Sequence, residues 1–229
     1  MILVSNLTKA YKTGSTELVV LKNLNLEVKQ GQFIAIIGRS GSGKSTLLHQ
    51  IGILDRPNSG DIILDGTNVS LLSEEERTDF RLRELGYVFQ DYALVPELTA
   101  LENVAVPLLM QGLQQVDAYA KGKKALAKIG LGERLNNLPN QLSGGEQQRV
   151  SIARAISHDP KIIFADEPTA NLDTETANTV LQTFIDLNKE GQTIVMVTHE
   201  PEYAMLTHRV VKLADGHIVA DGSPSEVKL

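Results

Sequence analysis

The nine residues 38–46 read G-R-S-G-S-G-K-S-T and combine glycines, hydroxyls and a lysine. They match the P-loop pattern G-x-x-x-x-G-K-[ST], between the apolar run 33–37 and Leu47-Leu48, which is the strand-to-helix setting that the pattern requires. Glycines let the backbone wrap around a polyphosphate, and the positive end of the following helix attracts the anion. A flexible Gly/Ser turn would not need this order of residues. The sequence therefore predicts a nucleoside triphosphate site, with contacts from Gly38, Arg39, Ser40, Gly41, Ser42, Gly43, Lys44, Ser45 and Thr46.

Within the loop, two side chains have predicted roles of their own. Lys44 is expected to reach the β- and γ-phosphates, and the Ser45 hydroxyl is expected to bind Mg²⁺.

Two adjacent carboxylates, Asp166 and Glu167, follow the apolar run 162–165. The carboxyl end of a buried strand is where α/β sheets place their ligands. We expect Asp166 to hold Mg²⁺ and Glu167 to polarise the attacking water as a general base. The alternative is a solvated acidic turn before Pro168.

A second device for binding anions is predicted at Ser143-Gly144-Gly145-Glu146, where a hydroxyl and two glycines precede a helical pattern. Taken alone, the string is also compatible with an ordinary helix N-cap. One nucleotide rarely needs two phosphate cradles in one chain. The pair is explained if the second cradle serves the nucleotide of another copy.

The elements that must position these residues follow an α/β pattern. Residues 2–7 and 19–28 alternate as strands of an antiparallel layer, and Asp65-Gly66 and Asp215-Gly216 predict hairpin turns. The continuous apolar runs 34–37, 162–165 and 194–197 predict parallel strands buried on both faces. Helical patterns between them indicate an α/β core.

Residues 91–158 carry helix-start signals and little strand pattern. Capping boxes are predicted at Ser73/Glu76, Thr99/Glu102 and Ser143/Glu146. We therefore predict one cassette over residues 1–229, with residues 1–90 and 159–229 as the α/β core and its β layer, and residues 91–158 as an inserted α-helical subdomain.

The composition excludes several kinds of protein. The net charge of −6 means that the chain has no overall positive potential to bind nucleic acid non-specifically. The absence of cysteine excludes disulfides and thiolate metal sites. The N-terminus does not resemble a signal peptide, and no apolar run approaches the roughly 18 residues that span a bilayer. Any role at a membrane is expected to depend on partners.

The motifs together resemble a known family. LSGGEQQR at 142–149, the P-loop at 38–45, IIFADEP at 162–168 and VTHE at 197–200 are similar to the nucleotide-binding subunit of an ABC transporter, over essentially the whole chain. The resemblance implies a P-loop ATPase core with an antiparallel β layer and a helical subdomain. It also implies ATP and Mg²⁺ as cofactors, a homodimer around two ATP molecules, and an integral membrane permease that holds the chain at the cytoplasmic face of the membrane.

The resemblance assigns roles to further residues. Tyr11 corresponds to the aromatic that stacks on adenine, although an exposed strand-end tyrosine is the alternative. Gln90 resembles the glutamine that contacts Mg²⁺ and the hydrolytic water. Asp173 belongs to a segment that resembles the loop crossing the dimer interface. His199 resembles the histidine at the γ-phosphate; a lone histidine there would more often be a packed residue. Glu146 stands where the family more often has glutamine, which we do not interpret as inactivation.

The branch within the family is indicated by residues 71–83, 94–104 and 145–155, which resemble the lipoprotein-releasing, macrolide-exporter and cell-division (FtsE-like) ATPases. Asp91-Tyr92 and Ile53 depart from that pattern. A transporter motor for efflux or lipid and lipoprotein extraction is the first interpretation, and an FtsE-like regulator of a membrane partner is the alternative. A soluble repair or translation ATPase fits less well, because the chain has one cassette and no room for a long coiled coil.

A short apolar cluster lies between Gln90 and the capped helix at Thr99. It could receive a short helix from a permease, or it could be core of the helical subdomain. Its members are Tyr92, Leu94, Val95 and Pro96.

Overall fold

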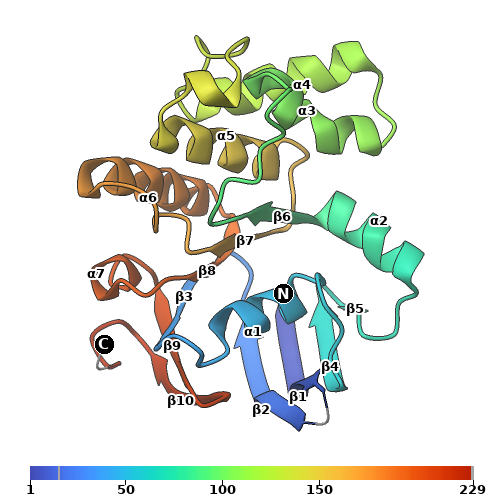
Figure 1. Cartoon of the computed structure of the whole chain (residues 1–229), viewed down its shortest axis with the longest axis vertical. Helices are drawn as coiled ribbons and strands as arrows, with labels where there is room; N and C mark the ends of the chain where they lie inside the picture. Colours follow the sequence, from blue (N-terminus) through green and yellow to red (C-terminus); the bar gives the residue numbers. More distant parts are fainter. Residues whose placement is uncertain (15, 228–229) are drawn as a thin grey trace. The chain divides into compact units, whose positions relative to one another are not determined.

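The computed structural model describes residues 1–14 and 16–227. The chain forms two compact units (Figure 1), one made of Met1–Asp79 and the chain from Gly191 onward, the other of Phe80–Glu190. The fold contains the predicted α/β core, an antiparallel layer and a group of helices.

The first unit contains an antiparallel sheet in the strand order β2-β1-β4-β5. Alternate residues of β1, such as Ile2 and Val4, are buried, as the period-2 pattern requires. The predicted antiparallel layer is thus confirmed. Its strands are β1 (Ile2–Thr13), β2 (Thr16–Val28), β4 (Ser59–Leu64) and β5 (Thr67–Asn68).

The same unit holds strands in the order β10-β9-β3-β8. β3 pairs in parallel with β8 and β9, and residues 33–37 and 193–197 are all buried, as continuous apolar runs predict. Helix α1 (Lys44–Ile51) packs against β3 and β8. The strands are β3 (Phe33–Gly38), β8 (Thr193–Val197), β9 (Arg209–Ala214) and β10 (His217–Gly222).

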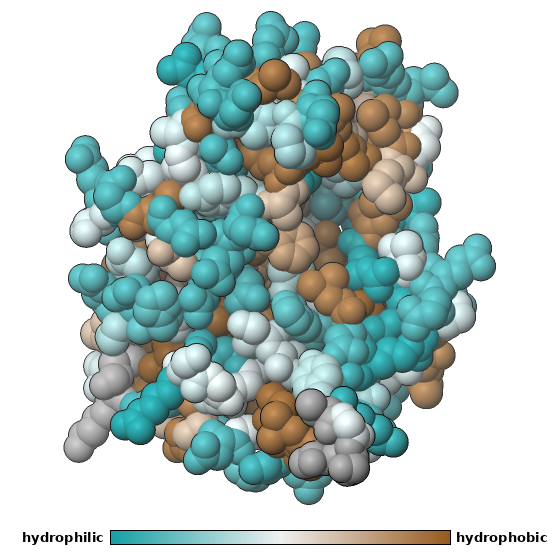
Figure 2. All heavy atoms as spheres, viewed as in Figure 1, coloured by the Kyte–Doolittle hydropathy of each residue, from teal (hydrophilic) through white to brown (hydrophobic). Residues whose placement is uncertain are grey.

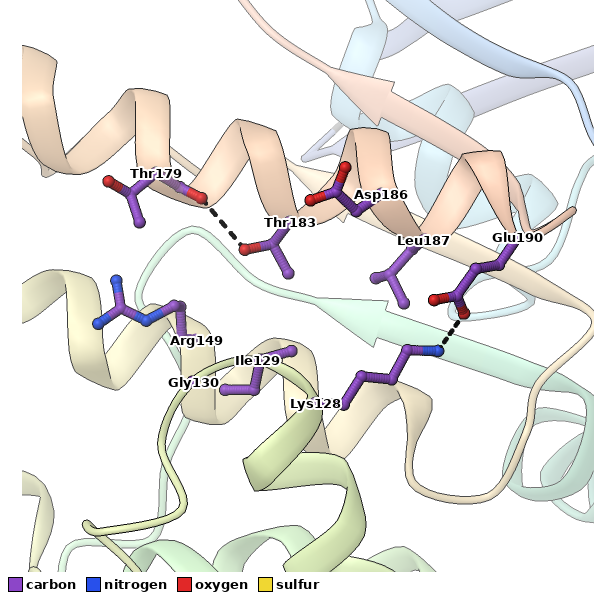
Figure 3. Close-up of a pocket in the computed structure, with 9 residues that line it drawn as sticks. All are labelled: Lys128, Ile129, Gly130, Arg149, Thr179, Thr183, Asp186, Leu187 and Glu190. Atoms are coloured by element: carbon purple, nitrogen blue, oxygen red, sulfur yellow. Dashed lines mark hydrogen bonds and ion pairs between the residues drawn. The ribbon is translucent and has the colours of Figure 1, made fainter.

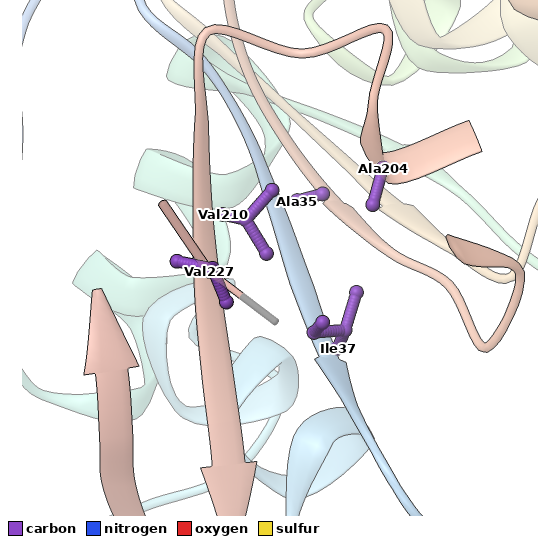
Figure 4. Packing of buried hydrophobic residues seen from close by; sticks show 5 residues of the cluster. All are labelled: Ala35, Ile37, Ala204, Val210 and Val227. Atoms are coloured by element: carbon purple, nitrogen blue, oxygen red, sulfur yellow. The ribbon is translucent and has the colours of Figure 1, made fainter. Parts of the chain in front are cut away.

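A small apolar cluster supports β3 from one side (Figure 4). The short helix α7 (Pro201–Ala204) packs there against β3. The cluster consists of Ala35, Ile37, Ala204, Val210 and Val227.

Both predicted hairpin turns are confirmed. Leu64 pairs with Thr67 and Ala214 with His217, so each connection has two residues. In both turns the aspartate and the glycine have positive φ, 46° and 83° in the first and 49° and 80° in the second. This is the type I′ geometry that Asp-Gly favours.

The second unit combines two parallel strands, β6 (Leu85–Val88) and β7 (Ile162–Asp166), with helices. Helices α3, α4 and α5 pack on one another, and α5 also packs on β6 and α6. Helix α2 (Glu74–Glu84) leads from the first unit into the second. The other helices are α3 (Ala100–Met110), α4 (Gln115–Lys128), a 3₁₀ turn (Pro139–Gln141), α5 (Gly144–Ile156) and α6 (Thr174–Lys189).

The three predicted capping boxes all form. At α3, Thr99 Oγ1 accepts a hydrogen bond from Glu102 N (3.3 Å), and Glu102 Oε2 accepts one from Thr99 N (2.8 Å). The same reciprocal bonds join Ser73 to Glu76 and Ser143 to Glu146. Within residues 1–14 and 16–227, no helix is both long and apolar enough to cross a membrane.

Candidate nucleotide site

The P-loop connects the carboxyl end of β3 to the first turn of α1 in the first unit. Gly43 is the N-cap of α1 with φ of 103°, and a Cβ there would lie 2.9 Å from Leu21 Cδ2. A Cβ on Gly38 would lie 2.4 Å from the carbonyl oxygen of Leu213. The loop therefore follows a path that only glycine permits at these two positions.

The N-terminus of α1 differs from those of the capped helices. Thr99, Ser143 and Asp173 cap α3, α5 and α6 with a side-chain oxygen, whereas Gly43 has no side chain with which to cap α1. The first N–H groups of α1 consequently lack a side-chain acceptor at the N-cap. Such N–H groups, together with the helix dipole, form an anion site.

The loop surrounds a buried positive charge. Lys44 is 7% exposed, and its Nζ donates hydrogen bonds to the carbonyl oxygens of Gly38 (3.0 Å) and Arg39 (3.3 Å). The Ser42 hydroxyl is also buried and has no hydrogen-bond partner in the described chain. Arg39, Ser40 and Gly41 are exposed, while Ser45 and Thr46 are half-buried. The arrangement is suited to a polyphosphate.

Tyr11 and His199 also belong to the first unit. Tyr11 lies on β1 with 38% of its surface exposed, and a side-chain hydrogen bond with Thr46 links it to the P-loop helix. Burial, followed by the neighbouring Asp55 carboxylate, raises the pKa of Tyr11. His199 is exposed, follows β8, and its Nε2 lies 3.1 Å from Glu200 Oε1. Because β8 is parallel to β3, His199 and the P-loop lie at the same edge of the sheet.

The second unit brings Gln90 and the two carboxylates to one edge. Val88 pairs with Ala165 in parallel register, so Gln90 and Asp166 both lie beyond the carboxyl ends of their strands. Glu167 has φ of 42°, a strained backbone conformation for a residue with a side chain. Burial and the negative charge of Asp166 raise the pKa of Tyr87 on the neighbouring strand.

The LSGGE segment and the Asp173 loop lie together in the same unit. A Cβ on Gly145 would lie 2.1 Å from Thr176 Cγ2, so α5 approaches α6 very closely there. Asp173 accepts hydrogen bonds from Thr176 N (3.0 Å) and Thr176 Oγ1 (2.7 Å). Ser143 is exposed beside this contact and caps α5. The N-cap interpretation of the serine is therefore confirmed, and its role toward a nucleotide stays a prediction.

Glu146 has local partners. Its carboxylate accepts hydrogen bonds from Ser143 N (2.9 Å) and from Arg134 Nε (3.0 Å). These bonds, that of Ser143 first, hold the pKa of Glu146 below its ordinary value.

Several contacts were not predicted from the sequence. Asp55 and Lys9 contact Tyr11, and Thr176 contacts both Gly145 and Asp173. Asn171 Nδ2 donates a hydrogen bond to the carbonyl oxygen of Gln90 (3.3 Å). The contacts Asp55–Tyr11, Thr176–Gly145 and Asn171–Gln90 each join residues that are more than 30 positions apart in the sequence. No short sequence pattern therefore signals them.

An open pocket of about 340 Å³ on the second unit does not coincide with the predicted site (Figure 3). Lys128 and Glu190 form an ion pair at one end, and Arg149 and Asp186 add one charge of each sign. The pocket lies between α6, the C-terminal end of α4 and the middle of α5, and none of the predicted nucleotide contacts lines it. Its lining is Lys128, Ile129, Gly130, Arg149, Thr179, Thr183, Asp186, Leu187 and Glu190.

Comparisons with known proteins bear on the identity of the chain. The ABC transporter family model matches residues 21–170. The ABC transporter ATP-binding protein YknY of Bacillus subtilis is 46% identical over 97% of both chains. The lipoprotein-releasing system ATP-binding protein LolD of Aquifex aeolicus is 50% identical over 88% of this chain and 90% of its own.

A solved structure is similar over nearly the whole length. The dimeric ATP-binding cassette MJ0796, in a post-hydrolysis state bound to ADP and Pi, superimposes with a TM-score of 0.90 and 41% identity, covering 98% of this chain and 99% of that one. The sequence, the P-loop geometry and the relatives agree. The chain belongs to the ABC transporter family, as an ATP-binding and ATP-hydrolysing subunit.

Proposed function

We propose that two copies of the chain enclose two ATP molecules and that hydrolysis drives a separate membrane permease, in efflux or in lipid or lipoprotein extraction. The P-loop carries the proposal: an uncapped helix N-terminus, a buried lysine and an unpartnered buried hydroxyl converge on one glycine-lined turn. The relative that releases lipoproteins supports the extraction branch.

The first unit would bind most of the nucleotide. Residues 38–46 would hold the phosphates through backbone N–H groups and Lys44, whose ammonium would move from loop carbonyls to the β- and γ-phosphates. Tyr11 would stack on adenine, and His199 would contact the γ-phosphate.

The second unit would supply the base for hydrolysis. Glu167 would accept the proton of the attacking water at its carboxylate, and Gln90 would orient that water. The strained φ of Glu167 supports this role, because such strain concentrates at functional sites. Asp166, one residue earlier, ends the buried strand β7.

Mg²⁺ fits the donors that the chain offers. Residues 1–14 and 16–227 contain no group of three or more histidine, aspartate or glutamate side chains that could hold a metal alone. Mg²⁺ typically uses one or two protein oxygens together with substrate phosphates. Ser45, Gln90 and Asp166 are the proposed protein ligands, directly or through water. The ion would neutralise charge on the phosphates.

The second copy would contribute Ser143, Gly144, Gly145, Glu146 and Asp173 to the opposite nucleotide. The support is that Gly145 and Asp173 both contact Thr176, while Ser143 stays exposed. The dimeric state of the MJ0796 cassette also supports it.

The permease would dock on the segment that follows Gln90, and it would hold the chain at the cytoplasmic face of the membrane. Val95 is 42% exposed and Pro96 is exposed, whereas Tyr92 and Leu94 are half-buried. Asn103 fixes the Val95 backbone through both its N–H and its carbonyl oxygen. Apolar side chains also gather on the surface over α3 and α4 (Figure 2). Exposed apolar residues of these two helices are Leu109, Met110 and Val116.

The dependence of ATPase activity on protein concentration tests the shared site. Turnover per chain should rise with concentration and then level off, because hydrolysis needs two copies. Turnover that is independent of concentration, in a protein that light scattering shows to be monomeric, would refute the shared site. With the protein at the concentration where turnover levels off, stimulation of ATP hydrolysis by vesicles that carry the permease would then test the coupling.

A further inference from the structure

Tyr11 is held by two residues that no motif includes. Lys9 and Tyr11 are two positions apart on β1, so their side chains leave the same face of the strand. Lys9 Nζ lies 4.8 Å from the centroid of the Tyr11 ring, a cation–π distance. The Lys9 residue is 8% exposed, so this ammonium covers one face of the ring from the protein side.

The second residue is Asp55, which follows α1. The Tyr11 hydroxyl donates a hydrogen bond to Asp55 Oδ2 (3.0 Å), and Lys9 Nζ donates one to Asp55 Oδ1 (2.8 Å). One carboxylate therefore connects the ring's hydroxyl to the cation above the ring.

Asp55 is itself fixed by the backbone around it. Its Oδ1 accepts a hydrogen bond from Arg56 N (2.7 Å), and its carbonyl oxygen accepts one from the nearly buried Arg77 (2.7 Å). Its N–H donates to the carbonyl oxygen of His49 in α1 (3.3 Å). Burial alone would raise the pKa of Asp55, but the bonds from Lys9, Arg56 and Tyr11 lower it on balance. The anchor is thus a rigid anion tied to the same helix that begins at the P-loop.

We infer that Asp55 and Lys9 are positioning residues that hold the Tyr11 ring ready for the adenine base, with one ring face covered and the other available. This inference rests on the proposed role of Tyr11 as the stacking residue. A ring held at its hydroxyl and on one face loses little rotamer freedom when a base stacks on it, and such preorganisation strengthens binding. Because the Asp55 backbone is hydrogen-bonded to α1, the base platform and the phosphate cradle share one support.

The test compares two probes, ATP and inorganic tripolyphosphate, each with Mg²⁺, by calorimetry on the purified protein. Tyr11→Phe keeps the ring and removes only the hydroxyl. It should weaken ATP binding about tenfold, as expected for losing a hydrogen bond to a charged group, and leave tripolyphosphate binding unchanged. Asp55→Asn should act in the same direction. The double variant should be no weaker than the stronger single variant, because both changes break one contact.

Tyr119→Phe is the matched control, since Tyr119 hydrogen-bonds to Glu102 within the second unit. It should leave the affinity for both probes unchanged. Equal losses for ATP and tripolyphosphate in Tyr11→Phe would mean a merely structural role and would overturn the inference. If Tyr11→Ala weakens ATP binding and Tyr11→Phe does not, the proposed stacking of Tyr11 on adenine is retained, and the inference that Asp55 positions the ring through the Tyr11 hydroxyl is refuted. If Tyr11→Ala leaves ATP binding unchanged, the proposed stacking role itself fails, and the inference fails with it.

Discussion

At the scale of single residues, Glu167 combines a carboxylate at the end of a buried strand with a backbone conformation that residues with side chains rarely adopt. A general base needs a fixed position relative to the water that it activates, because proton transfer requires hydrogen-bond distance. Glu167 immediately follows the last residue of β7, and its positive φ is the kind of strained conformation that concentrates at functional sites.

Glu167→Gln should retain ATP affinity and lower the hydrolysis rate at least about 100-fold, because the amide has nearly the same shape and cannot accept a proton. Calorimetry measures the binding, and phosphate release measures the rate. Glu175→Gln, on the exposed side of α6, is the control and should hydrolyse normally. Near-normal turnover in Glu167→Gln would exclude Glu167 as the base.

At the scale of elements, the helix N-termini divide into two groups. Helices α2, α3, α5 and α6 satisfy a first-turn N–H group with a side chain of the chain itself, whereas α1, like α4 and α7, has no side-chain cap. The capped ends are structural contacts whose strength depends on an ionised carboxylate in the capping boxes. Their contribution to stability therefore depends on pH.

Glu102 shows the sign of this dependence. Hydrogen bonds from Thr99, that of its side chain first, lower the pKa of Glu102 below the ordinary 4.5. A lowered pKa means that the carboxylate stabilises the fold above pH 4.5 and that this contribution is lost as the pH falls through the folded-state value. When the pH is lowered from 6 to below 4.5, the free energy of unfolding should therefore fall less in Glu102→Gln than in the unchanged protein.

Urea unfolding midpoints, measured without nucleotide at several pH values, provide the measurement. Glu133→Gln replaces an exposed glutamate outside any capping box and should retain the full acid dependence of the unchanged protein. An identical acid dependence in Glu102→Gln would show that the ionised Glu102 carboxylate contributes no measurable stability.

At the scale of the whole molecule, the LSGGE segment and the Asp173 loop meet at Thr176, which contacts both Gly145 and Asp173. Ser143 and Asp173 are exposed there, and the proposed ligand of this surface is the nucleotide of a second copy. The proposal separates two events: binding of ATP by one chain, and closure of two chains around it.

Ser143→Arg should leave ATP binding by the single chain intact and abolish both dimer formation and hydrolysis, because the added bulk and charge would block the second copy. Size-exclusion chromatography of the Glu167→Gln background with ATP reports the dimer. Ser73→Arg is the matched control, because Ser73 caps α2 with the same reciprocal hydrogen bonds. This variant therefore loses a helix cap of similar strength, about 1 kcal/mol, away from the proposed contact with the second copy. Loss of ATP binding by the Ser143→Arg monomer would place Ser143 in its own chain's pocket.

The proposed permease contact belongs to the same scale. Val95→Asp should abolish co-purification with the membrane subunit and spare basal ATPase activity, because the side chain is exposed and the Val95 backbone stays bonded to Asn103. Val219→Asp, at a 56% exposed position on β10, is the control and should retain the membrane subunit. A lower melting temperature in Val95→Asp, with the fold disturbed, would favour the alternative in which this cluster is core.

The sequence by itself determined the features that depend on residues close together along the chain. The P-loop pattern, the two Asp-Gly hairpins and the three capping boxes each need residues within a few positions of one another. In the hairpins and the capping boxes the backbone geometry also follows from local sterics and local hydrogen bonds, whereas the P-loop glycines are required in addition by close contacts with Leu21 and Leu213.

Only the tertiary structure decided which distant residues support the site. Asp55 reaches Tyr11 across 44 positions and Thr176 meets Gly145 across 31, through contacts that form only when the sheets and helices have packed. The structure also showed that Val95 is exposed and Leu94 half-buried, a distinction that hydropathy does not make. The physical reason is that burial and long-range contacts are set by the packing of whole elements, whereas turns and caps are set by neighbours along the chain.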